Sequence, residues 1–302
     1  MIYQEHPAFE KPADHNAKLW RYFSFTKFTA LLQYGALYFT VAAKLEDEHE
    51  GTLPWGNLKK LDPELVKGYA QERRVTVVNC WHLNEEESAL MWRVYAGHGE
   101  GIAIQSTFDR LTKCFLDEDG RLKGEAVHVG LIKYIDFRKD EIPDTNMFAP
   151  IIYKRKYFEH EREVRAVYRP WGWGNVDSQM LLAALSQGAH DGVSVRVDLQ
   201  TLIENVYVAP TSRDWFYELV RSILPESLPL KFSRLDDPPH RPGRERMPRR
   251  RVYAFPNWGS SMDSQALDEW LREAEEKSRE QPQDGVEPPG GDDKNPERKP
   301  GG

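Results

Sequence analysis

The clearest pattern of apolar and polar residues lies between Cys80 and Gln105, a run that reads CWHLNEEESALMWRVYAGHGEGIAIQ. We interpret it as the end of a strand, a helix, a glycine turn and a second strand. Asn84 is a favourable N-cap residue, and Glu87 stands three residues later, as in a capping box. The helix is predicted to end in a turn formed by Gly97, Gly99 and Gly101.

The predicted helix carries two large aromatic residues, Trp92 and Tyr95, which lie three positions apart and therefore share a face. His98 follows in a turn that has little side-chain bulk. These three residues are candidates for the wall of a binding pocket, whereas Leu90 and Met91 are interpreted as core residues.

The rest of the chain alternates short elements. Period-two alternation and β-branched or aromatic runs predict further strands at residues 19–25, 37–41, 75–81, 125–137, 161–168, 193–197, 205–208 and 228–232. Capping residues and helical spacing predict short helices at residues 26–32, 62–73, 106–115, 180–185 and 212–224. The last helix places Trp215, Leu219 and Ile223 on one face. We therefore predict one α+β domain, residues 18–235, with a mostly antiparallel, partly split sheet flanked by short helices.

The two ends of the chain depart from this pattern. Residues 1–17 are polar and contain two prolines, which predicts a flexible arm. The composition changes again at Asp236, where six arginines and four prolines are followed by an acidic stretch rich in proline and glycine. We predict a largely disordered tail at residues 236–302 with a short helix near residues 263–279. The arginines could bind phosphates or could belong to a self-compensating flexible segment.

Composition narrows the classes of protein to consider. Of the 302 residues, 40% are apolar and 12% aromatic, enough for a sizeable core, and the formal net charge is -7. An acidic chain does not suggest nucleic acid or an anionic membrane as partner. We expect a cytoplasmic protein, because the sequence shows neither a membrane span nor a secretory leader. The two cysteines, Cys80 and Cys114, fit a reducing compartment and are expected to be small buried residues.

One predicted strand carries a concentrated set of charges. Strand geometry places Glu161, Glu163 and Arg165 on the same face, with successive side chains roughly 7 Å apart. Two carboxylates beside a guanidinium can stabilise a developing cation, or one of them can acquire a raised pKa for acid–base work. The same pattern is also typical of a solvated edge strand, and charge runs more often indicate surface.

The residue patterns of common metal and nucleotide sites are mostly missing from the sequence. The cysteines and histidines, including His82 and His128, match no structural zinc spacing. Asp47, His49 and Glu50 are a better candidate for a magnesium or manganese site, although clustered acids in a turn are usually only solvated. The sequence contains no Walker loop, no nucleophile elbow and no strand-linked dinucleotide fingerprint, so we predict none of those folds. We assign no residue as a metal ligand.

Three passages together resemble one bacterial family. The Cys80–Leu83 segment with ALMWRVYA at 89–96 and GEGIAI at 99–104 is similar to the hallmark of domain-of-unknown-function family 2971. LWRYFS at 19–24 and FEHEREVR at 158–165 resemble two further strands of that family, in the same order over residues 19–235. Where the family has the turn F-N-D-P-F-E, this chain has LEDEHE at 45–50 and keeps only Asp47 and Glu50.

The order of elements is also similar to that of ADP-ribosyltransferase-like domains, which is an analogy of layout. That resemblance implies NAD as co-substrate, with Glu163 or Glu161 as the catalytic carboxylate and Arg165 beside them. It further implies that Arg21 or Tyr22 holds the phosphate or ribose of NAD and that Trp92 or Tyr95 stacks on nicotinamide.

Our leading hypothesis is accordingly an NAD-consuming transferase or glycohydrolase, acting as a bacterial toxin or in phage defence. A second hypothesis is a non-catalytic sensor or interaction module that recruits a protein partner through the tail. A third is a metal-dependent nuclease or phosphoesterase that uses Asp47 and Glu50. The sequence alone leaves these three open, and the decisive observation is whether Arg21, Trp92, Tyr95 and Glu163 meet in one cleft.

Overall fold

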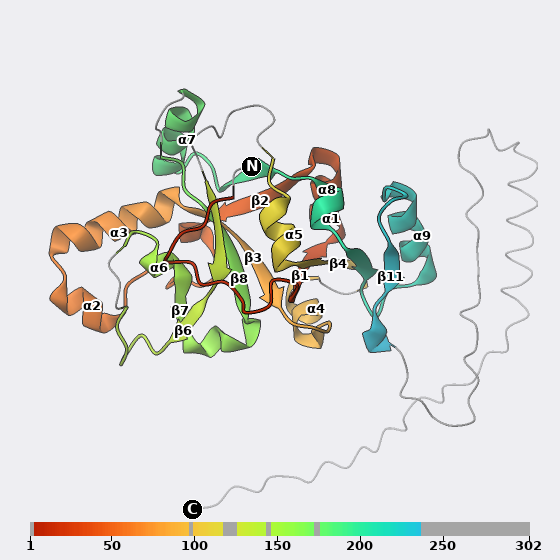
Figure 1. Ribbon diagram of the computed structural model, residues 1–302, viewed down its shortest axis with the longest axis horizontal. Coiled ribbons are helices and arrows are strands. Elements are labelled where there is room, and N and C mark those ends of the chain that lie inside the picture. Colours follow the sequence, from red (N-terminus) through yellow and green to blue (C-terminus); the bar gives the residue numbers. More distant parts are fainter. Residues whose placement is uncertain (1–2, 97–98, 117–125, 143–145, 172–175, 237–302) are drawn as a thin grey trace, which may run out of the picture. The chain divides into compact units, whose positions relative to one another are not determined.

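Short strands and helices alternate along the chain in the computed structural model (Figure 1), which describes residues 3–96, 99–116, 126–142, 146–171 and 176–236. The strands are β1 (Lys18–Ser24), β2 (Ala36–Val41), β3 (Val77–Leu83), β4 (Gly101–Thr107), β5 (Val127–Leu131), β6 (Lys133–Ile135), β7 (Tyr153–Arg155), β8 (Glu163–Tyr168), β9 (Gly192–Arg196), β10 (Asn205–Val208) and β11 (Leu230–Phe232). The α-helices are α1 (Phe25–Tyr34), α2 (Trp55–Lys60), α3 (Pro63–Val75), α4 (Ala89–Tyr95), α5 (Phe108–Lys113), α6 (Ala149–Ile152), α7 (Val176–Ser186), α8 (Leu199–Leu202) and α9 (Asp214–Ile223). The 3₁₀ helices are η1 (Ala42–Lys44), η2 (Lys156–Glu161) and η3 (Arg234–Asp236).

A mixed, mostly antiparallel sheet runs through the domain (Figure 1). Its strand order is β11-β10-β4-β1-β3-β2-β9, and β8 pairs with β3 and β5 outside this path. Within this sheet β10 and β11 run parallel, and β6 and β7 form a separate parallel pair. The predicted α+β class with a mostly antiparallel sheet is therefore confirmed.

The sheet is split along one edge of β3. On that edge β3 pairs first with β2, through Thr40↔Val78, and then with β1, through Trp20↔His82. The opposite edge of β3 pairs with β8 without a break. Residues 79–81 thus face an opening roughly 13 Å long, from the four rises of about 3.3 Å between Val78 and His82. The chain between the two pairings, residues 21–39, leaves this edge, pairs with β4 and β9 instead, and contains α1.

Each face of the sheet packs against helices. On one face, Leu19 and Phe23 of β1 join the largest apolar cluster, which also takes side chains from α1, α5, α8 and α9. On the other face lie two smaller clusters, one with Val78, Val167 and residues of α3 and α6, and one with Trp20, Tyr22 and residues of α4. Burial of these apolar side chains is the main favourable contribution to folding.

Local sequence signals account for several element ends. Gly35 ends α1 in the left-handed conformation, at φ 54°, as predicted for a glycine at that position. The Asp62 side chain accepts a hydrogen bond from the backbone N–H of Glu64, and Pro63 occupies the first position of α3. Thr107, one residue beyond the predicted Ser106, caps α5 through the N–H of Arg110.

Some predicted boundaries were wrong. The long strand at residues 125–137 is two strands, β5 and β6, that belong to different sheets. The helix after β3 begins at its cap Ser88, so Asn84 does not cap it. Glu87 instead accepts hydrogen bonds from Trp92, Ser233 and the backbone of Arg234, because it is buried between α4 and η3. The predicted face Trp215, Leu219 and Ile223 of α9 is exposed, and Phe216 and Val220 fill the core.

The structure describes most of the predicted arm, but only the first residue of the predicted tail. Residues 3–10 lie against β5, where Tyr3 bridges to Val127 and Phe9 is buried above Gly130. His15 and Ala17 accept backbone hydrogen bonds from the start of α5. The predicted tail lies outside the described residues from residue 237 onward. Among the described residues, none of the helices combines the length and apolarity needed to cross a membrane.

Candidate functional site

At the opening beside β3, hydrogen bonds from side chains take the place of backbone pairing. The Arg21 guanidinium leaves β1 and donates through Nη1 to the carbonyl oxygen of Cys80, at 2.7 Å. The Asn79 side-chain amide donates to the carbonyl oxygen of Tyr38, at 2.8 Å. Both bonds satisfy backbone carbonyls at the point where the strands diverge, as buried polar groups require.

A pocket of about 720 Å³ lies at this opening, and we call it the acidic pocket. Its lining includes side chains from β1, β3, α4, β7 and η2, and from the loop at residues 45–50. Six of its described residues are acidic, namely Glu46, Asp47, Glu48, Glu50, Glu161 and Glu163. Four are basic, namely Arg21, Lys27, Lys154 and Arg155. The excess of carboxylates favours a ligand group that carries positive charge.

The base of the acidic pocket is a buried network of charges. The Lys154 ammonium contacts Glu50 at 2.7 Å, Glu161 at 2.5 Å and Glu163 at 3.4 Å. The Arg165 guanidinium binds both oxygens of Glu163, at 2.6 and 2.8 Å, and reaches Glu50 at 2.8 Å. We call Glu50, Lys154, Glu161, Glu163 and Arg165 the charge network. Three carboxylates share two cations in it, so one negative charge is left over.

Two carboxyl groups of the charge network, Glu161 and Glu163, were predicted to be catalytic. Their surroundings shift their pKa values in opposite directions. Burial raises the pKa of Glu163, but the charges of Arg165 and Lys154 outweigh it and hold the pKa below its ordinary value. Burial raises the pKa of Glu161 above its ordinary value, and the single contact with Lys154 does not reverse this. Glu163 is therefore ionised across the physiological range, while Glu161 gains a proton more readily.

Burial also shifts the pKa values of two further groups in the acidic pocket. Burial raises the pKa of the Cys80 thiol, and the nearby Glu163 charge raises it further, so the thiol remains protonated at neutral pH. Burial also lowers the pKa of Arg21, whose Nε is buried and has no hydrogen-bond partner among the described residues. A ligand oxygen placed beside Arg21 would satisfy that donor.

A partly buried ion pair holds the loop of the acidic pocket in place. Arg155 donates to both oxygens of Asp47, at 3.1 and 2.7 Å, which joins β7 to the loop at residues 45–50. The Phe158 ring lies beneath both cations of β7, with the Lys154 nitrogen 4.8 Å and the Arg155 guanidinium carbon 5.4 Å from its centroid.

Five of the predicted site residues line the acidic pocket: Arg21, Tyr22, Tyr95, Glu161 and Glu163. Arg165 lies behind them and is 1% exposed, so it acts on the pocket through Glu163. Trp92 is buried away from the lining, with its ring edge-on to Tyr22 and its indole N–H donated to Glu87. Trp92 and Tyr95 thus differ in exposure, at 3% and 47%. His98 lies outside the described residues.

The interpretation of the acidic strand as a solvated edge was wrong. β8 pairs with β3 on one side and β5 on the other, and Glu163 and Arg165 are buried within it. Glu161 does not share the strand, because Arg162 turns the chain in the left-handed conformation and ends η2 there. The two glutamates meet through Lys154 instead of through strand spacing.

The candidate metal ligands have other partners. Asp47 pairs with Arg155, and Glu50 pairs with Lys154 and Arg165. Among the described residues, no group of three or more histidine, cysteine or acidic side chains could hold a metal ion. Cys114 is fully buried as predicted, whereas Cys80 lines the acidic pocket.

Sequence reasoning missed two members of the charge network. Lys154 lies in a segment with no distinctive pattern, and Glu50 stands out in the sequence only as a candidate metal ligand. Glu50 and Arg165 are 115 positions apart along the chain, and no local pattern signals such a pairing. The one signal for Lys154 is that a lysine stands beside apolar residues in an extended segment.

Comparison with known proteins identifies no relative: no family model, curated protein or solved structure matches this chain.

Proposed function

We propose that the acidic pocket binds the nicotinamide riboside end of NAD and breaks the bond between the ribose and nicotinamide, as an NAD glycohydrolase or ADP-ribosyltransferase. The observation that carries this proposal is the pair Glu161 and Glu163, adjacent in one pocket with pKa values shifted apart. Two carboxyl groups separated in this way are typical of a site that stabilises a cation and also moves a proton.

The chemistry assigns a separate task to each glutamate. As the bond from ribose C1′ to the nicotinamide nitrogen breaks, its electron pair leaves with neutral nicotinamide and the ribosyl group becomes an oxocarbenium-like cation. The ionised Glu163 carboxylate stabilises that cation. Glu161 accepts the proton of the attacking hydroxyl, from water or an acceptor, as the new bond to C1′ forms. Its raised pKa makes it a stronger base than an ordinary carboxylate.

Other residues of the acidic pocket support binding in this proposal. Arg21 has a buried Nε to offer to a ribose or phosphate oxygen. The half-exposed Tyr95 ring is placed to stack on the nicotinamide ring. Lys154 and Arg165 keep Glu163 ionised and fixed in orientation, so they are positioning residues. The split sheet and the resemblance to ADP-ribosyltransferase-like layouts agree with this assignment.

The proposal is tested by incubating the full chain with NAD and measuring released nicotinamide. We expect Glu163→Gln to reduce the rate about 100- to 1000-fold, the usual effect of removing one electrostatic stabiliser. Glu159→Gln is the matched control, because Glu159 is exposed on the same turn and should retain the rate. Glu161→Gln is a second test at a less buried position, where the substitution is less able to disturb the fold. No release by the unmodified chain, or full activity in folded Glu163→Gln, would refute the proposal.

A further inference from the structure

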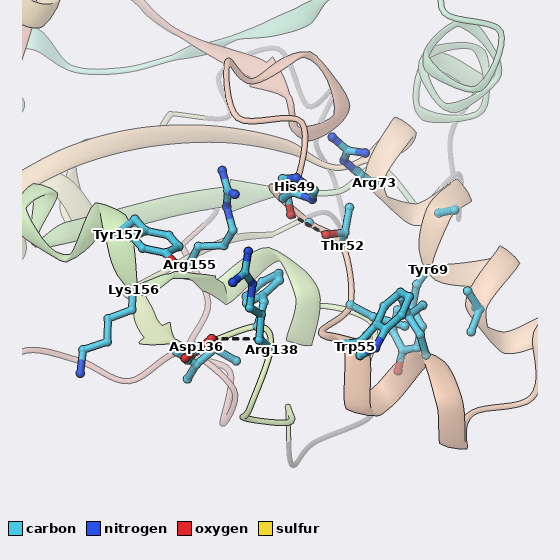
Figure 2. A pocket seen from close by; sticks show the side chains of 17 residues that line it. His49, Thr52, Trp55, Tyr69, Arg73, Asp136, Arg138, Arg155, Lys156 and Tyr157 are labelled. Atoms are coloured by element: carbon cyan, nitrogen blue, oxygen red, sulfur yellow. Dashed lines mark hydrogen bonds between the residues drawn. The ribbon is translucent and has the colours of Figure 1, made fainter.

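A second pocket, of about 1000 Å³, lies beside the acidic pocket and has the opposite character (Figure 2). We call it the basic pocket. Arg73, Arg138, Arg155 and Lys156 line it, against one acidic residue, Asp136, in the described part of the chain. His49 and Arg155 line both pockets, so the two cavities adjoin. In a chain with a net charge of -7, such a local excess of basic side chains indicates an anionic ligand.

The basic pocket also presents aromatic surface that the fold does not cover. Trp55 is 62% exposed and Tyr157 is 76% exposed, and Figure 2 shows them on opposite sides with Arg138 and Arg155 between them. Tyr69, which is buried, lies beside Trp55 on the neighbouring helix. Exposed aromatic rings around cationic groups suit a ligand with a flat base and phosphate groups.

One basic side chain has unused hydrogen-bonding capacity. Arg73 donates through Nη2 to the carbonyl oxygen of Glu48, at 2.7 Å, while its Nε is buried and has no hydrogen-bond partner among the described residues. An unsatisfied buried donor is costly unless a ligand or water meets it. A phosphate oxygen is the kind of acceptor that would do so.

The charges of the two pockets complement the charges at the two ends of NAD. The acidic pocket fits the cationic nicotinamide riboside end, and the basic pocket fits adenine and the diphosphate. Resting on the proposed function, we infer that the basic pocket binds the adenosine diphosphate end of the same dinucleotide, which crosses from one pocket to the other past His49 and Arg155. Binding energy gained at this remote end would raise the affinity for the whole dinucleotide.

Direct binding of ADP to the full chain, measured by titration calorimetry, tests the basic pocket without any catalysis. We expect Trp55→Ala and Arg138→Gln each to weaken ADP binding about tenfold. Trp215→Ala and Arg213→Gln are matched controls, since both residues are exposed on or beside α9 and line neither pocket, and they should bind ADP like the unmodified chain. Absent ADP binding, or binding that neither pocket variant weakens, would overturn the inference.

Kinetics then tests whether one molecule spans both pockets. Trp55→Ala should raise the KM for NAD about tenfold, leave kcat unchanged, and leave the KM for nicotinamide mononucleotide unchanged because that substrate lacks the adenosine end. Equal effects on both substrates, or none on NAD, would contradict the shared ligand. If ADP binds as expected but no nicotinamide is released, the proposed function fails while the assignment of the basic pocket to an adenosine phosphate stands.

Discussion

The acidic and basic pockets adjoin and share two residues, yet they handle charge in different ways. In the acidic pocket the decisive groups, Glu163 and Arg165, are buried in a central strand and hold each other in fixed positions. In the basic pocket the cations Arg138 and Lys156 lie exposed, Arg138 in a turn and Lys156 at the start of η2. A preorganised buried charge is suited to chemistry, whereas exposed charges are suited to attracting a ligand from solution.

The difference also predicts how each pocket responds to substitution. A buried ion pair is costly to break from one side, because the remaining charge has no water to solvate it. An exposed cation can be removed with little effect on the fold. The same kind of substitution should therefore have unequal effects on stability in the two pockets.

The largest expected effect is that of Arg165→Met. This change leaves Glu163 and Glu50 without their guanidinium partner in the charge network. We expect the free energy of unfolding to fall by about 3–5 kcal/mol in urea denaturation. Arg138→Met in the basic pocket is the comparison, with an expected change within about 0.5 kcal/mol. Similar losses for the two variants would show that the buried and the exposed charges do not differ in their effect on stability.

A second effect concerns the dependence of stability on pH. The pKa of Glu161 is raised by folding, so its contribution is present below its unfolded pKa and is lost as the pH rises through the folded value. The pKa of Glu163 is lowered, so its contribution is present above its unfolded pKa, about 4.3, and is lost as the pH falls toward the folded value. The two glutamates therefore make the fold sensitive to pH from opposite directions.

The corresponding measurement is urea denaturation at a series of pH values. Relative to the unmodified chain, Glu163→Gln should lose stability less steeply below about pH 4.3, and Glu161→Gln should lose less stability as the pH rises toward neutrality. An unchanged slope in Glu163→Gln would mean that its carboxylate does not carry the acid sensitivity assigned to it.

The smallest effect is expected at the boundary between the pockets. Asp47→Asn removes the charge that pairs with Arg155. The Asp47 side chain is 6% exposed and that of Arg155 is 29% exposed, so the cost in stability should be about 1–2 kcal/mol. With Arg155 released from that pairing, ADP should bind a few-fold more tightly. Added salt should reduce this gain, because the pocket is open to water and its charges are screened. Weaker ADP binding in Asp47→Asn would indicate that Arg155 must be held in place by Asp47 in order to act.

The sequence predicted the α+β class and most helices because those follow from local capping, periodicity and glycine positions. It also selected Arg21, Tyr95, Glu161 and Glu163, which the structure brings to one pocket. It could not predict Lys154 and Glu50 as their partners, because those contacts join segments that only the tertiary fold brings together. It misjudged Trp92 for a related reason: spacing assigns a helix face, but the neighbouring elements decide whether that face is exposed.

The uninterrupted pairing of β3 with β8 makes β3 the reference against which the rest of the site is aligned. Cys80 stands opposite Arg165 and His82 opposite Glu163, while the other edge fixes where β1 and β2 attach. Side chains alternate between faces, so deleting one residue from the middle of β3 would turn half of that strand over. Such a deletion would change the length of the opening, misalign Arg21 and disperse the charge network at once. The segment 77–83 should therefore accept replacement of side chains far more readily than any change in length.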